Sequence, residues 1–146
     1  MDFEIIDVSG DVGIRASGRD IKELFVNAAL GLYNLITDIK SVRPQRSINV
    51  EVRDDSLEGL LVRFLNELIF QFDTYGFIGN SLFLEGNIKN GTLEASENYW
   101  LKAEIKGEDF DPERHERRLL VKAATYHNLR LYKEDGLWKA DLIFDI

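Results

Sequence analysis

Two stretches of the chain repeat apolar residues with the period of an α-helix. The stretches run from Asp20 to Thr37 and from Ser56 to about Asp73, and each predicts a helix with one apolar stripe facing a core. Asp20 and Glu23 have the spacing of a capping box, Ser56 is a suitable N-cap, and Gly76 lies just past the second helix. The stripe residues are Ile21, Leu24, Phe25, Ala28, Leu32, Leu35 and Ile36 in the first helix, and Leu57, Leu60, Leu61, Phe64, Leu65, Leu68 and Phe72 in the second.

Most of the remaining chain alternates apolar and polar residues, which is the pattern of half-buried strands. The dipeptides Asn90-Gly91 and Asp135-Gly136 are typical hairpin turns between such runs. The predicted order is strand, strand, helix, strand, helix and then about five strands. This order indicates an α+β fold with a largely antiparallel sheet and two main helices. The clearest alternating runs are residues 12–17, 48–52, 99–105 and 138–145.

The most polar segment is Lys106–Arg118, with the sequence KGEDFDPERHERR. Its composition predicts a surface loop with a helical turn that begins at Pro112. His115 lies in this charged loop, so its side chain is expected to be exposed.

Composition narrows the function classes. The 146 residues are 45% hydrophobic, which fits a single folded domain. The 26 acidic and 18 basic residues give a formal net charge of -8, which argues against direct binding to nucleic acid because that needs a basic surface. The chain has no cysteine, which excludes disulfides and Cys-based metal sites. It shows no signal peptide and no apolar run of the roughly 20 residues that span a bilayer, which favours a cytoplasmic protein without a membrane partner.

Acidic residues near the two ends of the chain are the candidates for chemistry. Asp7 and Asp11 flank a tight turn, and Asp145 lies beside Ile146, whose α-carboxylate ends the chain. If the last strand pairs beside the first hairpin, these hard oxygen donors converge on a site suited to Ca²⁺ or Mg²⁺. Chance proximity of solvated acids is the alternative interpretation, since 26 residues are acidic. No phosphate-binding loop, G-x-S-x-G or H-E-x-x-H motif is present, so no catalytic residue is assigned.

Two further residues have structural interpretations when they are taken by themselves. Lys122 alternates with apolar neighbours and is expected on the solvated face of a sheet. His127 follows Thr125 and Tyr126 at the end of a strand, which favours a hydrogen-bonded structural histidine.

Several short strings, in order along the whole chain, resemble the archease family. The string DVSGDVGI at 7–14 is similar to the family's opening D-H-T-A-D-[IV]-G-[IL], and the chain ends in the family's aliphatic-Asp-[IVL] pattern. Val8 stands where the family's opening motif has histidine, so any role for an imidazole at that position is missing here. The other matching strings are AALGLY at 28–33, LNEL at 65–68, FDPERH at 110–115, KAATYH at 122–127 and LIFDI at 142–146.

The resemblance implies a fold and a role. Archease-like proteins have a strand-helix-strand-strand module of the SHS2 type with an inserted α+β subdomain, expected here at roughly 40–120 within one domain, 1–146. They activate the tRNA-splicing RNA ligase, a protein partner, by promoting guanylylation of its histidine and multiple turnover. They also broaden the nucleotide that the ligase can use. Such a protein is an accessory factor and not itself an enzyme.

The resemblance also implies site residues. Asp11 and Asp145 correspond to the family's metal ligands, with the terminal carboxylate of Ile146 as a further donor to a divalent cation, Ca²⁺ or Mg²⁺. Asp7 corresponds to the first acid of the opening motif, either as a ligand or as support for the turn. Lys122 and His127 correspond to residues of the partner surface.

Two alternatives from other classes remain open. A general chaperone or interaction module for nucleic-acid-processing enzymes would hold its metal for structural reasons. A metal-dependent hydrolase would use Asp7, Asp11 and Asp145 on a phosphoester.

Overall fold

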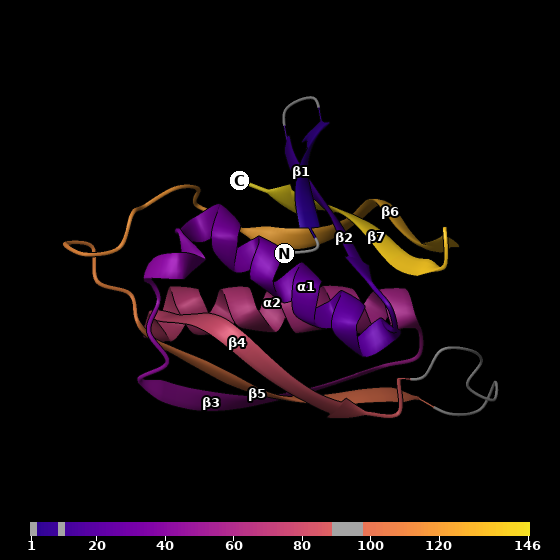
Figure 1. Ribbon diagram of the computed structural model, residues 1–146, viewed down its shortest axis with the longest axis horizontal. Coiled ribbons are helices and arrows are strands. Elements are labelled where there is room, and N and C mark those ends of the chain that lie inside the picture. The colour runs from indigo at the N-terminus through magenta and orange to yellow at the C-terminus, as the bar shows by residue number, and fades with distance from the viewer. Residues whose placement is uncertain (1–2, 9–10, 89–97) are drawn as a thin grey trace.

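The computed structural model describes residues 3–8, 11–88 and 98–146, with the side chains of Asp7 and Val8 left out of the description. Two antiparallel sheets enclose a layer of two helices (Figure 1). The elements in chain order are β1 (Phe3–Val8), β2 (Asp11–Gly18), α1 (Ile21–Ile36), the 3-10 turn η1 (Ile39–Ser41), β3 (Arg46–Asp54), α2 (Leu57–Tyr75), β4 (Phe77–Gly86), β5 (Tyr99–Asp109), β6 (Ala123–Glu134) and β7 (Leu137–Asp145).

The first sheet has the order β1-β2-β7-β6 and the second has the order β3-β5-β4. All pairs are antiparallel, which confirms the predicted α+β class. In the part of the chain that the structure describes, four strands follow α2 and not about five. The predicted turn at Asn90-Gly91 lies outside the described residues, and the division into a module and an insertion stays a prediction.

The helices begin and end where the local sequence predicts. The Asp20 side chain accepts a hydrogen bond from the Glu23 N–H (2.8 Å), and the Ser56 hydroxyl accepts one from the Gly59 N–H (2.9 Å). These caps satisfy N–H groups that have no partner inside the helix. Gly76 ends α2 with a φ of 71°, a left-handed conformation that glycine adopts without strain.

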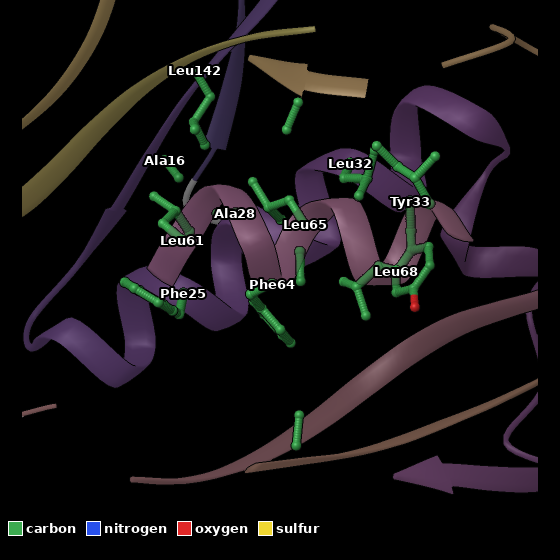
Figure 2. Close-up of a cluster of buried hydrophobic side chains, with 14 of the residues drawn as sticks. Ala16, Phe25, Ala28, Leu32, Tyr33, Leu61, Phe64, Leu65, Leu68 and Leu142 are labelled. Atoms are coloured by element: carbon green, nitrogen blue, oxygen red, sulfur yellow. The ribbon is translucent and has the colours of Figure 1, made fainter. Parts of the chain in front are cut away.

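α1 is buried on two opposite sides, whereas the pattern predicted a single stripe. Asn27, Ala29, Gly31 and Tyr33 are buried in addition to the stripe. Both sheets cause this difference, because each covers one flank of the stripe. The Asn27 amide donates to the Ser17 carbonyl of β2 (2.7 Å) and Gly31 lies against Ile14, whereas the Tyr33 ring lies against Gly79 of β4 in the second sheet. Figure 2 shows the Tyr33 ring reaching from α1 toward this sheet, and burial raises the pKa of its hydroxyl.

The predicted polar loop is shorter than expected. β5 continues to Asp109, so the loop begins at Phe110. The expected helical turn is present, since the His115 N–H donates to the Asp111 carbonyl (2.7 Å). None of the described helices is long and apolar enough to span a membrane.

The contact between the two helices gives a test of the core. Phe25 and Phe64 stack with ring centroids 6.3 Å apart, and both are fully buried. Replacement Phe64→Ala is expected to lower the free energy of unfolding by about 3–5 kcal/mol, because it removes apolar contacts and leaves a cavity. Urea denaturation would measure the loss.

Phe83, which is 64% exposed, is the control, and Phe83→Ala should change stability by less than about 0.5 kcal/mol. Equal losses in the two variants would contradict this core.

Candidate functional site

Strand register brings the two ends of the chain together at one end of the first sheet. Val12 in β2 pairs with Phe144 in β7, so Asp11 and Asp145, the residues one step beyond this pair on each strand, lie at the same end of the sheet. Val12 and the fully buried Phe144 face the helices, so the alternation of a strand puts both acids on the outer face. On the other side of β7, Ala123 pairs with Asp145.

Lys122 joins this end of the sheet through its backbone. Its N–H donates to the Asp145 carbonyl (2.8 Å), and its side chain is exposed. Asp145 and Ile146 are also exposed, and Asp11 is half-buried. We call Asp11, Lys122, Asp145 and Ile146 the carboxylate tip. Figure 1 shows the C-terminus lying beside the β1–β2 hairpin.

The role of Asp7 as a ligand or as support for the turn stays a prediction. The backbone of Asp7 pairs with Val12, while the side chains of residues 7–10 lie outside the described residues. Among the described side chains, no group of three or more histidine or acidic residues is placed to hold a metal ion.

The carboxylates of the tip are suitable ligands for a hard cation, but they are too few to complete its coordination. Asp11 and Asp145 offer carboxylate oxygens, the ligands that Ca²⁺ and Mg²⁺ prefer. Ca²⁺ takes about 6–8 oxygens, so this open set would need water or a partner's groups to complete it. The arrangement is therefore that of an exposed site that can be shared with a second molecule.

His127 lies in a β-bulge and not at the tip. Between the pairs Thr125–Ile143 and Arg130–Asp141 the register of β6 shifts, and Asn128 in this stretch has a φ of 50°. The bulge turns Tyr126 and His127 to solvent. The His127 ring is exposed, and its Nε2 lies 3.4 Å from the Asn128 amide nitrogen, so the hydrogen-bond partner of this histidine is its neighbour in the bulge.

An ion pair on the same outer face was not predicted. Arg15 donates to both oxygens of Asp141 (2.7 and 3.2 Å), and Tyr132 donates to the same carboxylate (3.3 Å). These contacts raise the pKa of Arg15, chiefly through the hydrogen bond to Asp141. Arg15 and Asp141 are far apart in the sequence, so only the β2–β7 register reveals the pair.

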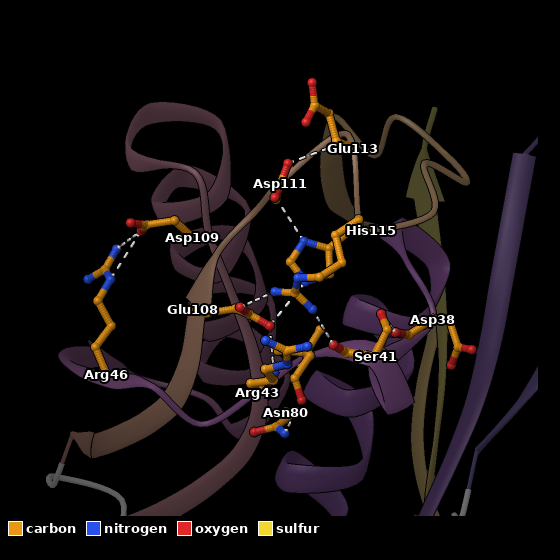
Figure 3. A network of polar contacts seen from close by, with 12 residues as sticks. Asp38, Ser41, Arg43, Arg46, Asn80, Glu108, Asp109, Asp111, Glu113 and His115 are labelled. Atoms are coloured by element: carbon orange, nitrogen blue, oxygen red, sulfur yellow. Dashed lines mark hydrogen bonds and ion pairs between the residues drawn. The ribbon is translucent and has the colours of Figure 1, made fainter.

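A second network fixes the loop that leads to Lys122. His115 is buried, which makes the prediction of an exposed side chain wrong. The Asp111 N–H donates to His115 Nδ1 (2.8 Å), so Nδ1 is the acceptor and Nε2 donates to Glu108 (3.1 Å) (Figure 3). Glu108 also accepts from Arg114 and from the Arg43 N–H (2.6 Å). Burial alone would raise the pKa of Glu108, but these hydrogen bonds outweigh it and lower the pKa to about 2.

The same loop also closes the end of α1. The N–H groups of Arg118 and Leu119 donate to the carbonyls of Ile36 and Leu35 (2.9 and 3.0 Å), which have no partner inside the helix. The Arg118 guanidinium lies at this negative end and donates to the Asn34 carbonyl (3.1 Å). The loop is thus held at two points before it reaches Lys122.

The chain is similar to known proteins along nearly its whole length. Residues 3–146 match the model of the Archease protein family (MTH1598/TM1083). The chain is 34% identical over 144 residues to Protein archease of Sulfurisphaera tokodaii, covering 99% of this chain and 98% of that one. It is 38% identical over 139 residues to Protein archease of Aeropyrum pernix, covering 94% and 92%.

Two solved structures share the fold. The solution structure of Methanobacterium thermoautotrophicum protein 1598 is 35% identical, with a TM-score of 0.78 over 99% of this chain and 98% of that one. The crystal structure of a Thermotoga maritima protein, described as an archease and possible chaperone, is 19% identical, with a TM-score of 0.64 over 98% and 96%. At that identity the second likeness concerns the fold alone.

The Glu108 network predicts a specific acid sensitivity. Because the pKa of Glu108 is about 2 in the folded chain and 4.5 ordinarily, this group stabilises the fold above pH 4.5, and the stabilisation is lost as the pH falls toward 2. At about 1.4 kcal/mol per pKa unit the loss is about 3 kcal/mol. Glu108→Gln should be less stable at neutral pH and lose less on acidification, as measured by urea denaturation from pH 7 to pH 2. Glu113→Gln, at an exposed position, is the control, and a Glu108→Gln profile parallel to the wild type would refute the assignment.

Proposed function

The chain belongs to the archease family, and from that premise we propose that it activates a tRNA-splicing RNA ligase as an accessory protein, with the carboxylate tip as its working surface. The observation that carries the proposal is the β2–β7–β6 register. It gathers Asp11, Asp145 and Lys122, which lie far apart in the sequence, at one exposed end of a sheet.

Exposed apolar side chains near the tip favour a protein partner. Leu120 and Tyr126 are each 62% exposed, and Ile146 is 46% exposed. Leu120 and Tyr126 flank the start of β6, and Ile146 follows β7, the strand beside it. Large apolar side chains that are open to water beside charged ones are typical of a docking surface.

The tip residues have distinct roles in this proposal. Asp11 and Asp145 hold a divalent cation, and the Lys122 ammonium provides donors for a nucleotide phosphate or for a carboxylate of the ligase. The cation, when bound, supplies positive charge to the phosphates of the nucleotide during guanylylation of the ligase histidine. The chain itself performs no covalent step, so its effect is to place charge in the active site of its partner.

The charge of the chain suits such a partner. An RNA ligase needs a basic surface for its substrate, and a chain of net charge -8 is attracted to that surface over a distance. This attraction speeds encounter and weakens with added salt.

The general chaperone is the competing proposal, because the Thermotoga maritima protein is described as a possible chaperone. For a chaperone, metal at the tip would support the fold and would not act on the chemistry of a partner. The variants that remove the acids should then lose thermal stability before they lose binding to the partner.

Removal of the tip acids tests the proposal. Asp11→Ala and Asp145→Ala should each reduce stimulation of ligase guanylylation and turnover by at least about tenfold, because each removes a charged ligand of the cation. Single-turnover and multiple-turnover ligation assays with purified ligase would measure this, and calorimetric titration with Ca²⁺ and Mg²⁺ would measure cation binding.

The matched control is Asp135→Asn, at the far end of the β6–β7 hairpin, where asparagine tolerates the φ of 54°. It should stimulate like the wild type. The proposal fails if the wild type gives no stimulation, or if both tip variants stimulate normally. A fall in melting temperature without a change in stimulation would favour the chaperone.

A further inference from the structure

A side chain of α2 holds the beginning of β6. The Asn66 amide nitrogen donates to the Ala124 carbonyl (3.2 Å), and the Ala124 N–H donates to the Asn66 amide oxygen (2.8 Å). Both backbone groups of Ala124 are therefore satisfied by one side chain, which comes from 58 positions earlier in the sequence.

These two hydrogen bonds take the place of those that a further strand would form at the open edge of β6. β6 is an edge of its sheet, so β7 contacts it on one side only. A buried backbone needs partners for both its N–H and its C=O, and a carboxamide offers a donor and an acceptor with the spacing of a peptide group. Asn66 thus acts on β6 as one peptide unit of a neighbouring strand would.

The clamp lies close to the carboxylate tip. Ala124 pairs with Phe144, and Ala123 pairs with Asp145. Lys122 then donates its N–H to the Asp145 carbonyl. The residue that Asn66 holds is therefore two positions from Lys122 and lies across from the strand that carries Asp145.

The preceding loop makes this anchor important. Leu119 is bound to the end of α1, and Ala124 is bound to Asn66. Lys122 lies in the short segment 120–123 between these two anchors. If the Asn66 anchor is lost, the start of β6 keeps its bonds to β7 but loses its hydrogen bonds to the helix layer.

We propose that Asn66 is a positioning residue of the carboxylate tip: through Ala124 it fixes the start of β6, and so it sets Lys122 against Asp145. The use of this geometry in cation binding and ligase activation rests on the proposed function. The clamp itself rests only on the contacts of Asn66.

Amide hydrogen exchange at single residues tests the clamp directly. In Asn66→Ala, the amides of Ala124 and Lys122 should exchange at least about tenfold faster, because two hydrogen bonds of the edge are lost. Asn66→Asp is the second variant, because it keeps the size of the side chain and the acceptor for the Ala124 N–H but loses the donor to the Ala124 carbonyl. It should speed exchange in the same segment, and it remains available if the alanine variant folds poorly.

Asn80→Ala is the matched control. The Asn80 amide also donates to a backbone carbonyl, that of Val42 (2.7 Å), but it lies in β4 of the other sheet. This variant should lose comparable stability without faster exchange at Lys122 or Ala124. Calorimetric titration with Ca²⁺ should give a dissociation constant several-fold higher for the Asn66 variants and unchanged for Asn80→Ala.

The outcomes separate the two proposals. Unchanged exchange at Lys122 and Ala124, or an equal change in Asn80→Ala, overturns the clamp. Faster exchange with unaltered Ca²⁺ affinity overturns the positioning role at the tip. If the wild type neither binds Ca²⁺ nor stimulates the ligase, the proposed function fails, while the exchange rates still decide whether Asn66 sets Lys122 against Asp145.

Discussion

The antiparallel pairing of β2 with β7 is the constraint on which the rest of the structure depends. It joins the first hairpin to the last strand, and the packing of its inner face fixes its register. Ile14 and Ala16 from β2 and Leu142 and Phe144 from β7 are all fully buried. Because side chains alternate, a slip of β2 by one residue would turn Ile14 and Ala16 toward water and Asp11 toward the helices. The hydrophobic core therefore determines where the tip acids lie, although it touches neither of them.

The layer of helices between two sheets has a second consequence. Since α2 packs against β3 of one sheet and β6 of the other, the open edge of β6 lies beside a helix and not beside water alone. Asn66 on that helix can therefore form the two hydrogen bonds to Ala124 that a neighbouring strand would otherwise form. A sheet edge that faced only solvent would have no such side chain beside it. The same layering explains why α1 is buried on two sides and why Tyr33 carries its hydroxyl into the core.

Local features could be predicted from the sequence, and features that depend on distant contacts could not. The caps at Asp20 and Ser56 and the stop at Gly76 are encoded within one helical turn, and all three are confirmed. Glu108 lies in the segment predicted to be a surface loop, yet it belongs to β5 and the later loop folds over it with Arg114 and His115. The tip acids were singled out from resemblance and from their place at the chain ends. That these acids lie at the same end of the sheet follows only from the register of β2 and β7.

Acids on the outer face of the first sheet differ in whether their charge is already paired within the fold. Asp141 lies on the same outer face as Asp145, but Arg15 and Tyr132 occupy its oxygens, so it has no free charge to offer. Asp11 and Asp145 form no ion pair with any described side chain, and they lie where the sheet ends and a second molecule has access. In the proposed function, the unpaired charge of these two acids is what attracts a cation or a basic partner to the tip. The local pairing of each acid decides its availability for a new contact, whereas the net charge of the chain acts over longer distances.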